Sequence, residues 1–406
     1  MDKLGAYIES IKGTNYRNYD FFNLIFSKKL NFITGKNGEG KTNIIDAIYF
    51  SCFTKSYFNA SDMLTIKNGS DFLRIETIAK SNGSDFEIIY KSERGKKKEF
   101  ELNGDKVDKF GLWIGKLPCV MIAPNDIELI YGGSEVRRKF LDATLSQVDK
   151  SYLLLLSAYN RYLLQRNSVL KNYFRGENIE NALLIEAYDN KLNEYGQKIF
   201  ALRQQFVLAF MDNFNRIYLQ MGGPKEHVNL HYVSDLATND YLEKLKNNFE
   251  KDKVLQRTTL GVHGDDLIFE LNGLSLKKTA SQGQQKTFLL ALKMAQFFFI
   301  KEQLNIVPIL LLDDIFDKFD EQRSNYLLEL VLKEEFGQVF ITDANESRMN
   351  VYLGRAKEYK VFKINNLQGE ASHEKEVIRI RRFNLPINLW DFFSTSASRF
   401  IPFDAV

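Results

Sequence analysis

The sequence predicts an α/β fold, namely a head with a mixed sheet and flanking helices into which a helical domain is inserted. Three features of the 406 residues support this fold class. A glycine-rich loop connects a strand-like segment to a helix-like one near the N-terminus, and a long stretch of helical periodicity occupies the middle of the chain. An apolar segment that ends in two aspartates follows, as expected for a buried parallel strand.

Composition places the chain among globular proteins, because 44% of its residues are hydrophobic and 26% are charged. The formal net charge is only +3, so any binding of nucleic acid must depend on local basic patches. Cys52 and Cys119 have no metal-type spacing, which argues against a disulfide framework and suits a reducing cytoplasm. The N-terminus lacks the apolar core of a signal peptide, and no apolar run approaches the ~20 residues of a membrane span.

Periodicity divides the chain into four parts. Residues 1–133 read as short strands with turns and form the N-terminal lobe of the head. Residues 134–223 are the helical insertion, residues 224–370 the C-terminal lobe of the head, and residues 371–406 an atypical tail. The strands expected in the N-terminal lobe are 6–11, 21–26, 30–34, 72–79, 86–91 and 99–102.

The glycine-rich loop matches the pattern G-x-x-x-x-G-K-S/T, the phosphate-binding loop of nucleotide-hydrolysing proteins, in the residues Gly35-Lys36-Asn37-Gly38-Glu39-Gly40-Lys41-Thr42. The glycines let backbone N–H groups wrap an anion, and the N-terminus of the following helix adds partial positive charge. Lys41 is expected to reach the β- and γ-phosphates, and Thr42 to hold Mg²⁺. The alternative is a glycine turn before an ordinary helix, but the strand-like and helical flanks favour the nucleotide site.

The helical insertion carries a heptad seam of apolar residues at steps of four and three. A short coiled-coil arm and a helical hairpin packed on itself both explain this seam. We favour the hairpin, because long coiled coils sustain more heptads. The seam consists of Tyr188, Leu192, Tyr195, Ile199, Leu202, Phe206 and Ala209.

The C-terminal lobe contains the apolar segment 308–312, which is followed by Asp313 and Asp314. Carboxylates at the C-terminal end of a parallel strand lie where α/β proteins bind ligands. Asp313 is placed to help bind Mg²⁺, and Asp314 to orient the attacking water. Strands at 227–233, 267–271 and 338–341 and helices at 281–301 and 321–333 complete the expected lobe.

A Ser-x-Gly-Gln-Gln loop opens the helix at 281–301. Ser281 is a plausible N-cap, and Gly283 leaves backbone N–H groups accessible. By itself this is a capped helix. Because it lies far along the chain from Lys41 and shortly before the two aspartates, the loop resembles the signature loop of ABC-type ATPases, which contacts the γ-phosphate bound to the other subunit.

Together these motifs resemble the RecF family, within the SMC/ABC group of ATPases, over about the first 370 residues. The combination of local strings is more specific than any single motif. The further strings that carry the resemblance are Asn15-Tyr16-Arg17-Asn18-Tyr19, Ala123-Pro124-Asn125-Asp126-Ile127, Arg137-Arg138-Lys139-Phe140-Leu141-Asp142, Tyr159-Asn160-Arg161, Gln165-Arg166-Asn167 and Arg257-Thr258-Thr259-Leu260-Gly261-Val262-His263-Gly264-Asp265-Asp266-Leu267.

The resemblance implies an ATP-binding protein that dimerises around ATP, hydrolyses it slowly and binds single-stranded, gapped or duplex DNA. It also implies action with RecO- and RecR-type mediators in recombinase loading, in DNA replication, recombinational repair and the SOS response. Arg17 and Asn18 would approach the nucleotide, whereas Ser281, Gly283 and Gln284 would serve the nucleotide of the partner subunit. The implied catalytic residues are Lys41, Ser281 and Asp314, and the pair Phe319-Asp320 would form the dimer-interface loop.

Departures from the family pattern qualify the resemblance. Only Lys55 is basic in a segment, 55–58, where the family has several basic residues, and Gly264 stands where an arginine is expected. Asp314 replaces the glutamate of many ABC-type heads. Since its carboxylate is one methylene shorter, and catalysis is sensitive to ~1 Å placement, turnover should be slow.

The sequence also bears on where DNA would bind and on which other functions are compatible with these motifs. Basic clusters at 96–98, 137–139 and 277–278, with no base-reading module, predict sequence-independent binding to phosphates. A transporter ATP-binding subunit is disfavoured, because Thr342-Asp343 stands where transporters carry a switch histidine. An SMC-like DNA-tethering head would need a longer coiled coil, and a clamp with negligible hydrolysis remains compatible with the same residues.

Overall fold

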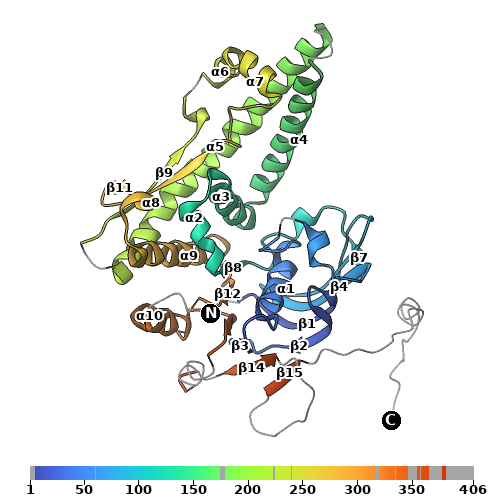
Figure 1. The fold of residues 1–406 in the computed structure, drawn as a ribbon, viewed down its shortest axis with the longest axis vertical. Helices are drawn as coiled ribbons and strands as arrows, with labels where there is room; N and C mark the ends of the chain where they lie inside the picture. Colours follow the sequence, from blue (N-terminus) through green and yellow to red (C-terminus); the bar gives the residue numbers. More distant parts are fainter. Residues whose placement is uncertain are drawn as a thin grey trace.

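The computed structural model describes residues 5–59, 61–173, 179–222, 225–238, 240–315, 321–333, 335–345, 354–356, 358–364 and 377–380. A six-stranded parallel sheet lies at the centre of the molecule (Figure 1). Its order is β15 (Val377–Ile380), β14 (Tyr359–Ile364), β3 (Leu30–Thr34), β13 (Val339–Asp343), β12 (Ile309–Asp313) and β8 (Cys119–Ile122). Four of these strands, β3, β13, β12 and β8, are buried along their whole length, as expected of a parallel sheet covered on both faces.

The N-terminal strands form a separate, antiparallel sheet. Its order is β2 (Tyr19–Ile25), β1 (Tyr7–Tyr16), β4 (Phe72–Ser81), β5 (Ser84–Glu93), β6 (Glu99–Leu102) and β7 (Asp105–Lys106). Helix α1 (Lys41–Phe53) lies between this sheet and the parallel sheet, because it contacts β1 and β4 on one side and β12, β13 and β8 on the other. The parallel and antiparallel strands expected of a mixed sheet thus lie in separate sheets.

A three-stranded antiparallel sheet and most of the helices lie on the other side of the parallel sheet. The sheet has the order β11 (Leu274–Ser275), β10 (Asp266–Leu271) and β9 (Val228–Val233). The α-helices here are α2 (Glu128–Tyr131), α3 (Ser134–Val148), α4 (Lys150–Tyr173), α5 (Ile179–Gly222), α6 (Tyr241–Asn247), α7 (Phe249–Leu255), α8 (Leu276–Thr279), α9 (Gln282–Leu304) and α10 (Glu321–Val331). Single 3₁₀ turns lie at Asp62–Thr65, Phe110–Leu112, Pro124–Ile127 and Asp235–Ala237.

The parallel sheet separates two hydrophobic cores. Leu310 and Leu312 of β12 belong to the core shared with α5 and α9, whereas Ile309 and Leu311 of the same strand belong to the core around α1. This alternation follows from the two-residue period of a strand. It explains why the strand is apolar throughout until Asp313.

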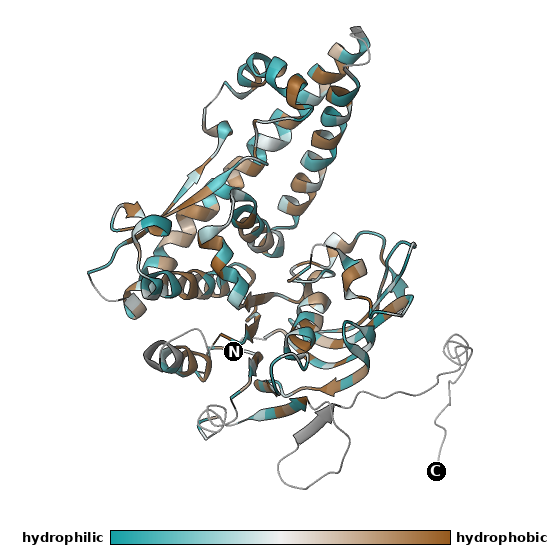
Figure 2. Cartoon of the chain, viewed as in Figure 1, coloured by the Kyte–Doolittle hydropathy of each residue, from teal (hydrophilic) through white to brown (hydrophobic). Residues whose placement is uncertain are grey.

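The insertion is a helical hairpin, as favoured from the sequence. Helices α4 and α5 pack against each other, and the rings of Tyr162 and Tyr195 stack with centroids 5.6 Å apart. Figure 2 shows hydrophobic and hydrophilic residues along both helices, as expected of amphipathic helices. Of the heptad positions, Leu192, Ile199 and Phe206 are buried, but Ala209 is exposed.

The seam ends near Ala209 because α5 changes partner there. From Phe206 onward α5 packs on α9, and its buried residues Phe206, Phe210, Phe214 and Tyr218 recur every four residues along one face of the helix. The rings of Phe206 and Phe299 lie 4.9 Å apart, and those of Phe214 and Phe288 lie 5.0 Å apart. Strands β9 and β10, expected in the C-terminal lobe, pack on α5 and α3 respectively. The domain boundaries at 133, 223 and 370 therefore stay a prediction.

Several expectations concern residues with little or no structural description. The pair Phe319-Asp320 lies outside the described residues, as does the tail 371–406 apart from β15. Cys52 and Cys119 are both buried and free in the structure. Among the helices that the structure describes, none is both long enough and apolar enough to cross a membrane.

Candidate nucleotide-binding site

The glycine-rich loop lies between β3 and α1, as its sequence pattern requires. Gly40 is the N-cap of α1 and has a φ of 109°, in the left-handed region. A Cβ at this position would lie 2.5 Å from Nδ2 of Asn18 and 2.6 Å from the hydroxyl of Tyr19. Glycine is therefore required here for both conformation and space. No acidic residue occupies the first turn of α1, so the N-terminus of the helix remains suited to an anion.

Lys41 is buried at the centre of the loop, with 3% of its surface exposed. Its ammonium donates hydrogen bonds to the carbonyl oxygens of Gly35 (3.0 Å) and Lys36 (3.3 Å) and to Oδ1 of Asn37 (3.3 Å). It also lies 4.0 Å from a carboxylate oxygen of Asp314. The buried positive charge of the loop therefore faces the strand that carries the two aspartates.

The register of the parallel sheet brings the loop and the two aspartates together. Asp313 pairs with Thr342 on the neighbouring strand, and Asp343 of that strand pairs with Thr34, the last residue before the loop. The carboxyl ends of β3, β13 and β12 consequently meet at one edge. There the hydroxyl of Thr42 donates to Oδ1 of Asp313 at 3.2 Å, although 271 positions separate the two residues.

Asp313 is held by more than Thr42. The hydroxyl of Thr342 donates to the same Oδ1 at 2.7 Å, and it accepts the backbone N–H of Asp314 at 2.8 Å. Burial, and to a smaller extent the neighbouring carboxylate of Asp314, raise the pKa of Asp313 to about 6, although both hydroxyls oppose this shift. A hydroxyl and a carboxylate side by side are hard oxygen ligands of the kind that Mg²⁺ prefers. The donor set of Thr42 and Asp313 therefore fits this ion.

Asp314 differs in environment from Asp313. It is partly exposed, with 29% of its side chain accessible, and its φ of 42° lies in the left-handed region that aspartate tolerates better than most residues. The chain thus turns sharply directly after β12. This turn leaves one carboxylate buried beside Thr42 and the other partly exposed near Lys41.

Arg17 and Asn18 lie beside the loop, but they differ in what they contact. Asn18 donates to the carbonyl oxygen of Glu39 at 3.2 Å and accepts from Nδ2 of Asn43 at 2.8 Å, so it supports the loop and the first turn of α1. Nη2 of Arg17 lies 2.5 Å from Oδ2 of Asp46, which is completely buried on α1. Arg17 is therefore bound to the helix behind the loop.

The proposed signature loop is a helix N-terminus with a complete capping box. The hydroxyl of Ser281 accepts the backbone N–H of Gln284 at 3.2 Å, and Oε1 of Gln284 accepts the N–H of Ser281 at 2.8 Å. Within the part of the chain that the structure describes, no hydrogen bond connects Ser281 or Gln284 to residues 35–42. In Figure 1, α8, which directly precedes this loop, lies well apart from α1.

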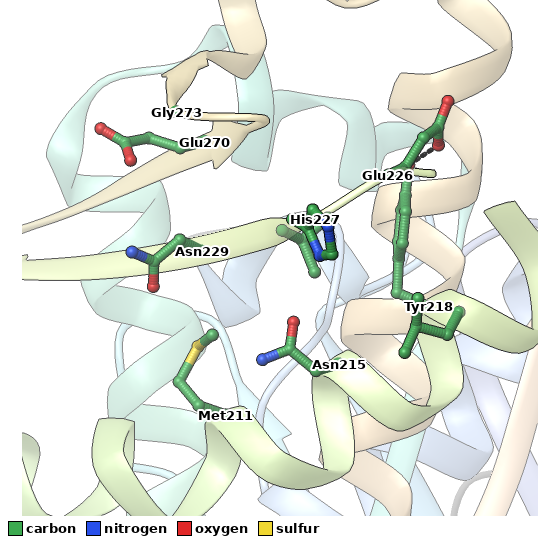
Figure 3. Close-up of a pocket in the computed structure, with 10 residues that line it drawn as sticks. Met211, Asn215, Tyr218, Glu226, His227, Asn229, Glu270 and Gly273 are labelled. Atoms are coloured by element: carbon green, nitrogen blue, oxygen red, sulfur yellow. Dashed lines mark hydrogen bonds between the residues drawn. The ribbon is translucent and has the colours of Figure 1, made fainter. Parts of the chain in front are cut away.

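Glu226 holds the proposed signature loop in place through a hydrogen bond with Gln284. Its carboxylate accepts Nε2 of Gln284 at 2.8 Å through one oxygen and the hydroxyl of Tyr218 at 2.6 Å through the other. Figure 3 shows Glu226 and Tyr218 at one side of a pocket of about 500 Å³ between the end of α5 and strands β9 and β10. Gln284 is therefore held at both ends of its amide.

Sequence reasoning missed a group of buried polar residues behind the loop. Asp46, Asp126 and Lys293 are each less than 7% exposed, and each belongs to a network of hydrogen bonds. The sequence did contain a signal, because Asp46 and Lys293 are each flanked by apolar residues before and after them in a helical segment. A charge in such a position is normally buried and paired. Its partner, however, was not readable from the sequence.

Comparison with known proteins agrees with the fold and the site. The family described as "RecF/RecN/SMC N terminal domain" matches residues 7–368. A protein from Flavobacterium johnsoniae named "DNA replication and repair protein RecF" is 42% identical over 86% of this chain and 98% of its own length. A protein of the same name from Parabacteroides distasonis is 39% identical over 88% of this chain and 97% of its own length.

Solved structures give the same result. The chain superimposes on a structure described as the "recombination mediator protein RecF-ATPrS in RecFOR pathway" with a TM-score of 0.79, at 29% identity, over 90% of this chain and 98% of that one. An Smc head domain from Pyrococcus furiosus is similar in fold, with a TM-score of 0.51 at 16% identity, over 88% of this chain and 93% of that one. The family that the sequence resembles is thus confirmed over nearly the whole described chain, and this protein belongs to the RecF family of DNA replication and repair proteins.

Proposed function

We propose that the chain is an ATP-driven, dimeric DNA clamp that hydrolyses ATP slowly. The observation that carries the proposal is the meeting of Thr42 with Asp313 beside Lys41, across the carboxyl ends of the parallel strands. Lys41 and the backbone of residues 35–42 would bind the phosphates, while Thr42 and Asp313 would hold Mg²⁺. Bound Mg²⁺ supplies charge neutralisation at the β- and γ-phosphate oxygens. Solved RecF structures named for ATP and an ATP analogue support this assignment.

Asp314 is proposed to orient the attacking water. Its carboxylate is partly exposed and lies near Lys41, and the hydrogen bond from its backbone N–H to Thr342 fixes its position relative to Asp313. Replacement of Asp314 by Asn should leave ATP binding intact and lower turnover by about 10²- to 10⁴-fold, the usual contribution of a positioned acid or base. Single-turnover hydrolysis and nucleotide binding measure the two effects. The assignment would be contradicted if Asp314→Asn hydrolysed ATP faster than the wild type. It would also be contradicted if the nucleotide-bound dimer of the variant did not live longer than that of the wild type.

A second chain is proposed to complete the site. Ser281, Gly283 and Gln284 lie at the N-terminus of α9, apart from residues 35–42 of the same chain, so in a dimer they would meet the γ-phosphate held by the partner. Sedimentation with and without ATP tests this arrangement on the wild-type chain and on Ser281→Arg, with Ser168→Arg, at an exposed position of α4, as a surface control. We expect ATP-dependent dimers that only Ser281→Arg abolishes. Monomers under every condition would refute the composite site.

DNA binding is proposed to depend on exposed lysines rather than on the arginines of the 137–139 cluster. Arg137 is committed to Asp266 through two contacts of 2.6 and 2.9 Å and also donates to two backbone carbonyls. By contrast, Lys97 and Lys278 have no ion-pair partner among the described residues, and the pair of Lys96 with Glu93 is on the surface. Such lysines are free to exchange solvent for phosphate.

The expected DNA binding is insensitive to sequence and steeply dependent on salt. Titration of gapped, duplex and single-stranded DNA between low and moderate salt gives the slope directly. Lys97→Ala should reduce the magnitude of that slope by about 1, the contribution of one phosphate contact. Salt-independent binding would exclude a phosphate-dominated interface.

Partnership with RecR- and RecO-type mediators, action at gaps in the SOS response and a cytoplasmic location complete the proposal. The name of the pathway in the related structures supports the first of these, the partnership with RecR and RecO. The relatives make a transporter subunit the weaker alternative. Adding DNA to the ATPase assay distinguishes these two functions. A DNA clamp should hydrolyse ATP faster when DNA is present, whereas the rate of a transporter subunit should not change.

A further inference from the structure

A buried lysine connects α9, the helix that follows the proposed signature loop, to the interior of the head. Lys293 lies on α9, and only 5% of its side chain is exposed. Its ammonium donates to the hydroxyl of Tyr57 at 3.1 Å and lies 3.3 Å from Oδ1 of Asp126. The ammonium is also 5.5 Å from the centre of the Tyr57 ring. A buried ammonium is stable only when it is paired in this way, so its position relative to both partners is fixed.

Tyr57 extends this contact toward the loop helix α1. Its hydroxyl donates to Asp126, while its backbone N–H donates to Oδ1 of Asp46 at 2.8 Å. Burial, followed by the carboxylate of Asp126, raises the pKa of Tyr57 well above its usual value. The hydroxyl therefore remains protonated and continues to donate. A single residue thus contacts Lys293 of α9 through its hydroxyl and Asp46 of α1 through its backbone.

Asp46 is the meeting point on α1, one turn after Thr42. Its second oxygen accepts the hydroxyl of Tyr16 at 2.8 Å and Nη2 of Arg17 at 2.5 Å. Arg17 directly precedes Asn18, which supports the glycine-rich loop. Hydrogen bonds, joined by the covalent chain at Tyr57 and at Arg17-Asn18, therefore connect α9 to α1 and to the glycine-rich loop.

We propose that Lys293 is a positioning residue that couples the two half-sites of one chain. One half-site is the glycine-rich loop, which would bind this chain's own nucleotide. The other is the signature loop at the start of α9, which would bind the partner's nucleotide. The network transmits a displacement of α1 to α9, so that occupation of the first half-site orients the second. This inference rests on the proposed ATP-dependent dimer.

The test compares two buried lysines of the same helix. Lys301 also lies on α9 and is 8% exposed, but its ammonium donates to the carbonyl oxygen of Glu335, away from α1. Lys293→Met and Lys301→Met therefore each remove one buried ammonium from α9, and only the first interrupts the network. Both are expected to lower the melting temperature of the full-length chain. Tyr57→Phe, which keeps the ring and removes the hydroxyl, interrupts the network by a smaller change and serves if Lys293→Met does not fold.

The readout is the ratio of the dimer dissociation constants without and with a non-hydrolysable ATP analogue and Mg²⁺, measured by sedimentation. Lys293→Met should reduce this ratio about tenfold, within the usual range of coupling between sites. Lys301→Met should change it by less than about twofold, as expected for an independent site. Binding of a fluorescent ATP analogue, measured in the monomeric Ser281→Arg background, should be unchanged by Lys293→Met.

The outcomes separate this inference from the function on which it rests. A wild-type chain that stays monomeric with nucleotide refutes both. A wild-type chain that dimerises with nucleotide, together with an unchanged ratio in Lys293→Met or in Tyr57→Phe, refutes the coupling alone. An equal loss in Lys293→Met and Lys301→Met also refutes it, because the effect would then follow from stability and not from the network.

Discussion

Gly40 gives the sharpest prediction about the site, because the structure allows its replacement to be divided into separate costs. Alanine at this position would keep a φ of 109°, which costs about 1–3 kcal/mol for a residue with a Cβ. The new Cβ would also lie 2.5 Å from Nδ2 of Asn18, so that side chain must move. Its two hydrogen bonds, to Glu39 and from Asn43, contribute about 0.5–1.5 kcal/mol each. The total loss is therefore roughly 2–6 kcal/mol.

Two control variants measure the backbone cost and the hydrogen-bond cost separately. Gly38 has a φ of 83°, and a Cβ added there would meet no atom within 4 Å, so Gly38→Ala carries only the backbone cost of about 1–2 kcal/mol. Asn18→Ala carries only the loss of the two hydrogen bonds. Urea unfolding gives the free energies, and titration with a fluorescent ATP analogue gives the affinity of the loop.

Gly40→Ala should be the most destabilised of the three variants and should bind nucleotide most weakly. Equal losses for Gly40→Ala and Gly38→Ala would show that the close approach of Asn18 and Tyr19 does not constrain the loop. The reasoning from the geometry of Gly40 would then be refuted, even if both variants bound nucleotide poorly.

Three further predictions concern the rest of the molecule. Glu226→Ala should weaken nucleotide-dependent dimerisation in sedimentation, whereas Glu226→Gln, which keeps an acceptor for Gln284, should not; equal behaviour of the two variants would exclude the anchoring role. Burial lowers the pKa of His263, so protonation of its ring is less favourable in the folded state than in the unfolded chain. The neutral ring's contribution to the stability of the folded state is complete above pH ~6.5 and is lost as the pH falls below that value. Thermal melts of the wild type should show this loss between pH 7.5 and 5.5, and His263→Asn should show a smaller slope. Arg203→Met should cost about 3–5 kcal/mol in urea unfolding, because it leaves the buried Asp265 without its cation, and a loss under 1 kcal/mol would contradict that pairing.

The loop and its two flanking elements were predictable because their determinants are local. Residues 30–34 form a strand and Lys41–Phe53 a helix, and within residues 35–42 the positive φ angles fall on glycines. The strand before Asp313 was equally readable from its run of apolar residues. Each of these predictions depended on a few neighbouring residues, and the structure agrees with them.

The distribution of strands between sheets was not predictable from the same patterns. Strand β9 alternates in burial as any half-buried strand does, yet it packs on α5 rather than joining the parallel sheet. Likewise, the heptad seam of α5 ends near Ala209 because α9 replaces α4 as its partner. Periodicity identifies a buried face, but it does not identify the element that covers it.

The sequence by itself determined the family, the phosphate-binding loop, the two aspartates and the capped start of α9, because each is a short string whose meaning is local. Only the tertiary structure decided what these strings contact. The sheet register placed Thr42 against Asp313, the fold directed Arg17 to Asp46, and the packing of α9 buried Lys293 between Asp126 and Tyr57. These contacts join residues far apart in sequence, and such pairings depend on which surfaces the whole chain buries.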